Sequence, residues 1–141
     1  MIQRTVLVLL AIMTLMVSSC GDLLNAQAAK DRDLGDMVQT NMRTSSEFIA
    51  NFVSFEFAGE PGKYICVTKD LNDAQAAGRF AYNAMVVLDE RNNTKVKTGR
   101  NNFIIIGQQN GTDIFEVTFG TGQITPTVTL KGPFAGEVYA P

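Results

Sequence analysis

The sequence predicts an α+β fold that is mainly β, with an N-terminal amphipathic helix followed by an antiparallel β-meander. Apolar residues recur at helical spacing over residues 34–53, and they alternate with polar residues in several later segments. Asn110-Gly111 stands between two apolar runs, which is the preferred chemistry of a tight hairpin turn. We expect about six or seven strands, which form a sandwich or a partly open barrel.

The predicted helix over residues 34–53 has one apolar face and one polar face. The apolar stripe consists of Leu34, Met37, Val38, Met42, Phe48, Ile49, Phe52 and Val53. An alternative for its second half is a capping box over residues 44–47, which would start a shorter second helix. The polar face is not rich in Lys and Arg, so we expect the helix to pack on the sheet rather than on a membrane surface.

The segments after the helix read as strands separated by turns. Residues 53–57 and 64–69 form a predicted hairpin, and Cys66 lies on its second strand as a buried small apolar residue. Asp70 caps a short predicted helix over residues 71–77, which Gly78 would terminate. Residues 79–90 read as a strand because their even positions are apolar, with a helix as the alternative.

The turn at Asn110-Gly111 predicts the register of the hairpin around it. Counting outward from the turn, Gln109 opposes Thr112, Ile106 opposes Phe115, and Ile104 opposes Val117. Opposed residues share a face, so the first apolar face consists of Ile104, Ile106, Phe115 and Val117. The other face carries Phe103 and Ile105, and it either lies under the helix edge or is available to a partner.

The last strands are predicted over residues 123–130 and 133–139. Pro126 cannot donate a ladder hydrogen bond, so the first of these strands belongs at a sheet edge or carries a bulge. No internal repeat or interdomain linker is visible, and residues 34–141 therefore read as one globular domain.

The N-terminus has the pattern of a bacterial export signal. Arg4 precedes an apolar run over residues 6–17, which is too short to cross a bilayer comfortably and matches a signal-peptide core. Residues 17–20, Val-Ser-Ser-Cys, stand at the end of this run and resemble the lipobox of bacterial lipoproteins. A poorer rival site, with cleavage at Ala28 and release as a secreted or periplasmic protein, is the alternative.

The lipoprotein resemblance implies that residues 1–19 are a signal peptide and that Cys20 carries a diacylglyceryl group, usually with a further acyl chain on the new N-terminus. Residues 20–33 would then be a lipidated tether. Such acyl chains hold a protein on a membrane without spanning it. Glycine rather than aspartate follows Cys20, which in this family favours the outer membrane over the inner membrane.

Composition excludes several functional classes. The chain has 12 Lys and Arg residues against 14 Asp and Glu residues, which argues against a basic nucleic-acid binder. It contains no histidine and only two cysteines, so the commonest general base and a Cys/His zinc site are both missing. The aspartates at 31, 33 and 36 do not have the spacing of a calcium-binding loop. We therefore expect no enzyme, no metal and no cofactor beyond the acyl groups.

Two sets of residues are candidate partner contacts. The first is the hairpin face with Phe103 and Ile105. The second is a basic segment that could hold an anionic envelope component, and it comprises Arg91, Lys95, Lys97 and Arg100. Cys66 has no histidine to activate it as a nucleophile, although a disulfide to Cys20 becomes an option if Cys20 is not lipidated.

The leading functional hypothesis is a membrane-anchored envelope lipoprotein with a small non-enzymatic domain that binds an envelope protein or polymer. The alternative is a carrier that encloses a small apolar ligand between the helix and a curved sheet. A hydrolase that uses only Asp and Glu side chains ranks last.

Overall fold

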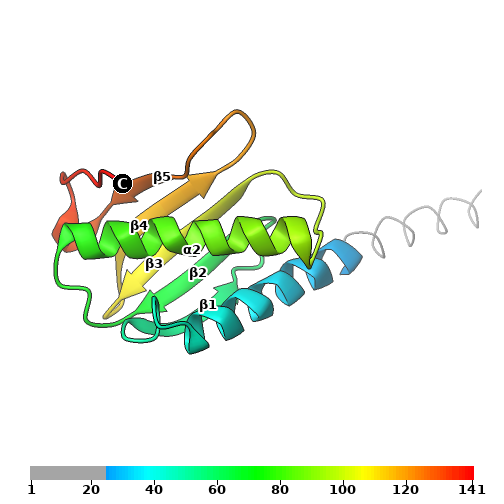
Figure 1. The fold of residues 1–141 in the computed structure, drawn as a ribbon, viewed down its shortest axis with the longest axis horizontal. Coiled ribbons are helices and arrows are strands. Elements are labelled where there is room, and N and C mark those ends of the chain that lie inside the picture. Colours follow the sequence, from blue (N-terminus) through cyan, green and yellow to red (C-terminus); the bar gives the residue numbers. More distant parts are fainter. Residues whose placement is uncertain (1–24) are drawn as a thin grey trace, which may run out of the picture.

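The computed structural model describes residues 25–141, which form an α+β domain with two helices and one five-stranded sheet (Figure 1). The signal peptide, Cys20 and the start of the expected tether lie outside the described residues. A helix covers residues 25–44, and turns over residues 46–51 lead into the first strand. The α+β class predicted from the sequence is confirmed.

The predicted helix over residues 34–53 coincides with the observed helix only up to residue 44. Residues 25–33, which were expected to belong to the tether, are helical and already contribute the buried side chain of Asp31. Phe48 is still buried at 1% exposure, but it reaches the core from the turn. Ile49 is 55% exposed, because the chain leaves the helix before the apolar stripe is complete.

The sheet is open and mixed, with strands in the order β1-β2-β3-β4-β5. Its strands are β1 Phe52–Phe57, β2 Lys63–Thr68, β3 Phe103–Gln109, β4 Thr112–Phe119 and β5 Thr127–Leu130. The first two strands pair antiparallel, as do the last three, but β2 and β3 are parallel. The expected all-antiparallel meander, closed into a sandwich or barrel, is therefore wrong.

The parallel pair depends on helix α2, Ala74–Thr94, which carries the chain from β2 back to the start of β3. Parallel neighbours need a long crossover, and a helix is its usual form. The strand predicted over residues 79–90 is thus wrong, and the helical alternative is correct. The buried residues of α2 recur at helical spacing: Ala74, Ala77, Gly78, Phe80, Ala81, Ala84, Met85, Leu88 and Asn92.

The start of α2 also differs from the prediction. Asp73, not Asp70, is the N-cap, and its Oδ1 accepts a hydrogen bond from the backbone N of Ala76 at 2.8 Å. Gly78 does not end the helix, because it lies inside the helix beneath Tyr139. A Cβ at position 78 would come within 2.4 Å of that ring, so glycine lets the C-terminal segment pack on the helix.

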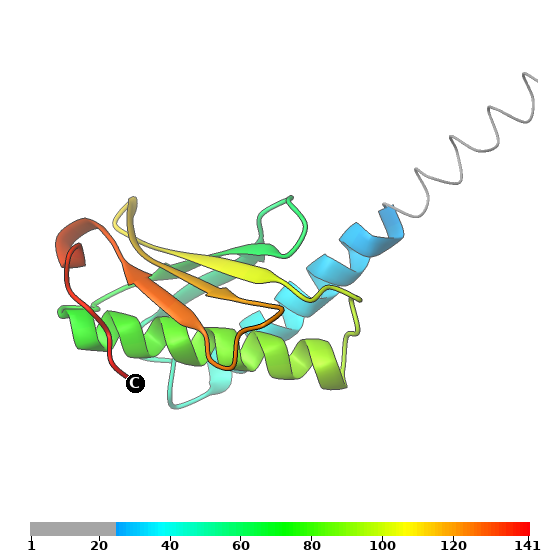
Figure 2. The same ribbon diagram turned by 90° about the horizontal axis from the view of Figure 1, so that it is seen from above.

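Both helices lie on one face of the sheet, and the opposite face is not covered by either of them (Figure 2). The core fills the space between the helices and the sheet. Its largest fully buried side chains are Tyr64, Phe48, Phe55, Phe115, Leu34, Met42, Met85, Leu88, Ile105, Ile114, Val38 and Val117. Cys66 on β2 is fully buried as well, as predicted.

The hairpin between β3 and β4 begins as the sequence predicts and then departs from it. Asn110 and Gly111 have positive φ angles of 53° and 75°, and Gln109 pairs with Thr112. The register then shifts between Gly107 and Gln108, so that β4 holds one extra residue. This bulge changes which side chains of β3 face the core.

The C-terminal elements agree with the prediction only in part. β5 lies at the sheet edge and begins directly after Pro126, as its missing N–H group requires. The predicted strand over residues 133–139 is wrong. The short 3-10 helix η1, Gly132–Phe134, occupies its start, and Pro133 is compatible with the first turn of such a helix.

Candidate functional site

The uncovered sheet face carries an aliphatic patch at its centre. Ile65 on β2 pairs with Ile106 on β3, and Val67 and Ile104 flank this pair on the same two strands. All four side chains are half-buried, in contrast to the fully buried residues that alternate with them. We call these four residues the outer patch.

Charged side chains border the outer patch on both sides. Glu56 on β1 pairs with Ile65, and Glu116 on β4 pairs with Ile106. Lys131 holds Glu116 through an ion pair of 2.6 Å, and the hydrogen bond to this carboxylate raises the pKa of Lys131 above its ordinary value. An apolar centre within a polar rim is the usual organisation of a protein-binding surface.

The structure places the predicted hairpin contacts in the core instead. Phe103 is 4% exposed and Ile105 is 0% exposed, so neither side chain reaches the surface. The bulge in β4 is the reason, because Ile105 opposes Val117 and Ile106 opposes Glu116. Ile104 and Ile106, which were expected in the core, lie on the uncovered face.

The four basic residues do not form a single patch. Arg91 is half-buried in the last turn of α2, Lys95 is its exposed C-cap, and Lys97 is exposed in the following loop. Arg100 turns inward and is bound to Asp31 on the first helix. Lys95 and Lys97 are therefore the exposed cations of this segment.

A groove of about 630 Å³ separates the first helix from the end of α2. Acidic Asp33 and Asp36 line one side of it, and basic Arg91 and Lys95 line the other. Met37 is its only aliphatic or thioether side chain, and the remaining lining residues are Thr40, Asn41 and Thr44. The groove thus presents mixed charge rather than the apolar lining of a lipid carrier.

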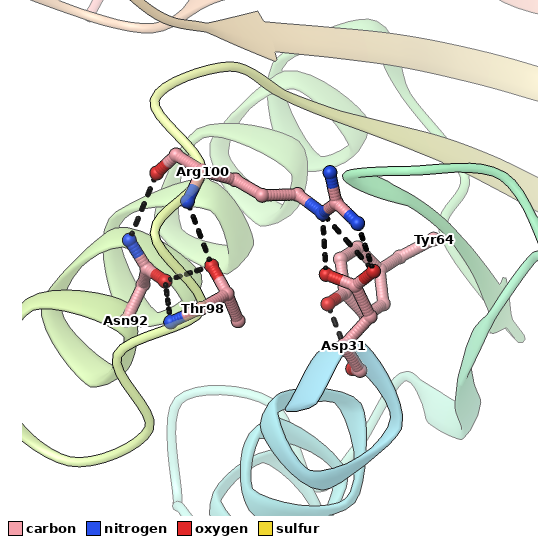
Figure 3. A network of polar contacts seen from close by, with 5 residues as sticks. All are labelled: Asp31, Tyr64, Asn92, Thr98 and Arg100. Atoms are coloured by element: carbon pink, nitrogen blue, oxygen red, sulfur yellow. Dashed lines mark hydrogen bonds and ion pairs between the residues drawn. The ribbon is translucent and has the colours of Figure 1, made fainter. Parts of the chain in front are cut away.

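Asp31 and Arg100 form a buried ion pair that fixes the first helix to the loop after α2 (Figure 3). The guanidinium binds both carboxylate oxygens, with Nε to Oδ1 and Nη2 to Oδ2 distances of 2.8 Å each. Asp31 is 0% exposed. The hydrogen bond to Asp31 raises the pKa of Arg100, so the guanidinium keeps its positive charge under all ordinary conditions.

Tyr64 on β2 completes this contact. Its hydroxyl donates a 2.8 Å hydrogen bond to the backbone carbonyl of Asp31. Burial raises the pKa of Tyr64, and the nearby charge of Asp31 raises it further, so the hydroxyl keeps its proton and remains a donor. Three elements, namely the first helix, β2 and the loop before β3, meet at this point.

A second polar group holds Arg100 in position. The side-chain oxygen of Asn92 accepts hydrogen bonds from the backbone N and the hydroxyl of Thr98, at 3.2 Å and 2.6 Å. The amide nitrogen of Asn92 donates to the backbone carbonyl of Arg100 at 3.3 Å. Figure 3 shows how these contacts fold the loop back toward the helix end. The cluster therefore has a structural role.

The sequence places Asp31 beside Asp33 and Asp36, but Asp31 alone of the three is buried. The helical period indicates this burial, because Asp31 lies three residues before Leu34 and seven before Val38, in line with the buried stripe. A carboxylate on the apolar stripe of a helix needs a buried cation as partner. Arg100 supplies it from a loop that the sequence alone does not place.

Residues 25–141 contain no group of three or more Cys, Asp or Glu side chains arranged to hold a metal ion. Within this same range, neither helix is both long enough and apolar enough to cross a membrane. No protein family, curated protein or solved structure matches the chain.

Proposed function

We propose that this protein is a lipid-anchored protein of the bacterial cell envelope, and that its uncovered sheet face binds another envelope protein. One observation supports the binding role above all others: the outer patch lies on a sheet face that neither helix covers. Contiguous apolar surface with a polar rim is typical of protein interaction sites. An apolar centre suits a protein better than a polar envelope polymer.

The anchor in this proposal is a diacylglyceryl group on Cys20, as the lipobox resemblance implies, with the outer membrane favoured over the inner one. The domain acts as a binding module and carries no catalytic assignment. A carrier of small apolar ligands is the weaker proposal. The helix-covered side of the sheet is filled by core side chains, and the groove beside the helices is lined by charged and polar residues.

Photo-cross-linking in intact envelopes tests the partner. A photoreactive residue replaces Thr118, which is half-buried beside Ile104 on the uncovered face, and a control probe replaces exposed Asn72 at the other end of the sheet. We expect one discrete adduct with an envelope protein from position 118 and none from position 72. The double variant Ile104→Gln, Ile106→Gln should abolish it, whereas Thr127→Gln on the edge strand should not.

Three results would contradict the proposed binding face. One is the absence of an adduct at position 118, and another is an equal yield at position 72. The third is an adduct that survives the double isoleucine substitution in a protein shown by circular dichroism to be folded. An adduct of two identical chains would assign the face to self-association instead.

The anchor has its own test. Cys20→Ala should release the protein from the membrane fraction or leave it unprocessed, and inhibition of the lipoprotein signal peptidase should leave the unsubstituted chain uncleaved. A Cys20→Ala variant that is still cleaved and still sediments with membranes would refute lipid attachment at this residue.

A further inference from the structure

Four segments gather at one end of the domain. Gln27 on the first helix shares a pocket with Pro61, Gly99 and Asn102. The loop over residues 120–126 joins them, because the backbone N of Thr121 donates to Asn102 Oδ1 at 3.2 Å. Figures 1 and 2 both show the start of the first helix on the same side of the molecule as these loops. We call this region the tethered end.

The covalent chain limits how far the tethered end lies from Cys20. Five residue steps separate Cys20 from residue 25, where the described helix starts, and a fully extended chain of that length spans at most about 18 Å. The ion pair between Asp31 and Arg100 fixes this helix to the loop over residues 95–102. An acyl group on Cys20 would therefore hold the tethered end, rather than the far end, close to the bilayer.

The tethered end has an exposed apolar residue that the fold does not use. Ile124 is 95% exposed in the loop over residues 120–126, and this loop contains no charged residue. An uncharged loop with a protruding isoleucine can enter the boundary between headgroups and acyl chains without burying a charge. Nothing in the described domain packs against this side chain.

Both ends of the domain expose charges of both signs. Lys95 and Lys97 are exposed at the tethered end together with Glu60, whereas Asp70, Asp73 and Asp113 are exposed at the far end together with Lys69 and Arg79. Hydrogen bonds of Gln109 to Leu71 and of Gln108 to Asp113 place those aspartates at the opposite ends of the same strands. An anionic bilayer attracts the two exposed lysines of the tethered end, Lys95 and Lys97.

From these observations we propose that the tethered end docks on the anionic bilayer surface that holds the anchor. Ile124 enters the interfacial region, and Lys95 and Lys97 contact lipid phosphates. This inference rests on the lipid anchor of the proposed function and adds an orientation to it. The strands then run away from the bilayer, and the outer patch extends from Ile104 beside the tethered end to Val67 farther from the lipid.

Collision accessibility of a spin label tests this orientation in the full acylated protein, reconstituted in phosphatidylethanolamine–phosphatidylglycerol vesicles. Thr125→Cys places the label beside an intact Ile124, and Asn72→Cys places it at the far end. Cys66 is fully buried and stays unlabelled. We expect the water-soluble relaxant to reach position 125 at least about twofold less than position 72.

Matched variants identify the contacts. One variant carries Ile124→Gln, and a second carries both Lys95→Gln and Lys97→Gln. In each variant, the accessibility of position 125 to the water-soluble relaxant should rise toward that of position 72. Neutral phosphatidylcholine vesicles should reproduce the lysine effect without any substitution.

Equal accessibility of positions 125 and 72 in protein that is acylated on Cys20 would overturn the docking and leave the anchor intact. Mass spectrometry of the N-terminal peptide checks the anchor separately. An unmodified Cys20 would refute the lipid anchor and the docking together.

Discussion

Arg100 and Asp31 are 69 residues apart in the chain and form a bidentate ion pair inside the domain. The carboxylate is fully buried, while the side chain of Arg100 keeps 21% of its surface exposed. This pair ties the helix nearest to Cys20 to the loop between α2 and β3. The pair therefore fixes residue 31 of the first helix against this loop.

Removing the charge of Asp31 should therefore destabilise the whole domain. Asp31→Asn leaves the guanidinium of Arg100 partly buried without a counter-charge, and we expect the free energy of unfolding to fall by about 2–4 kcal/mol. Urea unfolding followed by circular dichroism measures this change. Asp33→Asn, an exposed position on the same helix, is the matched control and should alter stability little. An Asp31→Asn protein as stable as the control would remove the structural role of the pair.

The loop over residues 95–102 should loosen when its polar support is lost. Asn92→Ala removes three hydrogen bonds at a buried position, so we expect a loss of about 1–3 kcal/mol and faster amide exchange at Thr98. Hydrogen exchange read by mass spectrometry reports the loop directly. Asn93→Ala, its exposed neighbour, serves as the control. Unchanged exchange at residue 98 would contradict this account.

Gly107 should not tolerate a side chain. A Cβ at this position would lie 2.2 Å from the ring of Phe115, which is itself fully buried, so Gly107→Ala forces the ring to move. We expect a loss of about 1–3 kcal/mol in urea unfolding. The same substitution in a Phe115→Leu background should cost less, because the smaller side chain leaves room. Equal costs in the two backgrounds would refute the steric explanation.

Stability should fall at alkaline pH. Burial raises the pKa of the Cys66 thiol, so the folded protein keeps a proton that the unfolded chain releases above about pH 8.5. The unfolded chain then binds fewer protons, and stability decreases as pH rises, by up to about 1.4 kcal/mol per pH unit for one group. Tyr64, whose pKa burial also raises, adds to the decrease above about pH 10.

Urea unfolding between about pH 8 and 10 measures this slope, in a Cys20→Ala background so that Cys66 is the only thiol. The further substitution Cys66→Ala should flatten the slope, because alanine does not ionise. Slopes are compared, not absolute stabilities, because the substitution also removes core volume. Equal slopes with and without the thiol would argue against its burial.

Features of the fold that depend on local chemistry could be predicted from the sequence. Asn110 and Gly111 adopt the positive φ angles that a tight hairpin needs. Pro126 lacks an N–H group, and the strand that follows it lies at the edge. Cys66 sits between apolar neighbours on a strand and is buried. In each case the residue type itself restricts the backbone or the environment.

Other features depend on contacts between distant segments, and for these features local sequence patterns predict the wrong element or register. Residues 79–90 fit both a period of two and a period of 3.6, and packing of alanines such as Ala81 and Ala84 against the sheet selects the helix. The bulge beside Gly107 shifts the register by one residue, because Phe115 fills the space above a glycine. Because of that single shift, Ile104 and Ile106 lie on the uncovered face of the sheet and not in the core.

The outer patch and the ion pair between Asp31 and Arg100 also depend on contacts between segments that are distant in the sequence. The outer patch consists of ordinary strand residues whose exposure follows from the bulge and from the placement of both helices on one face. The sequence around Asp31 predicts a solvent-exposed carboxylate, and its burial depends on the ion pair with Arg100, which is 69 residues away in the chain. The sequence specifies turns, edges and apolar strands through local backbone preferences, whereas long-range packing specifies which faces are buried and which charges meet.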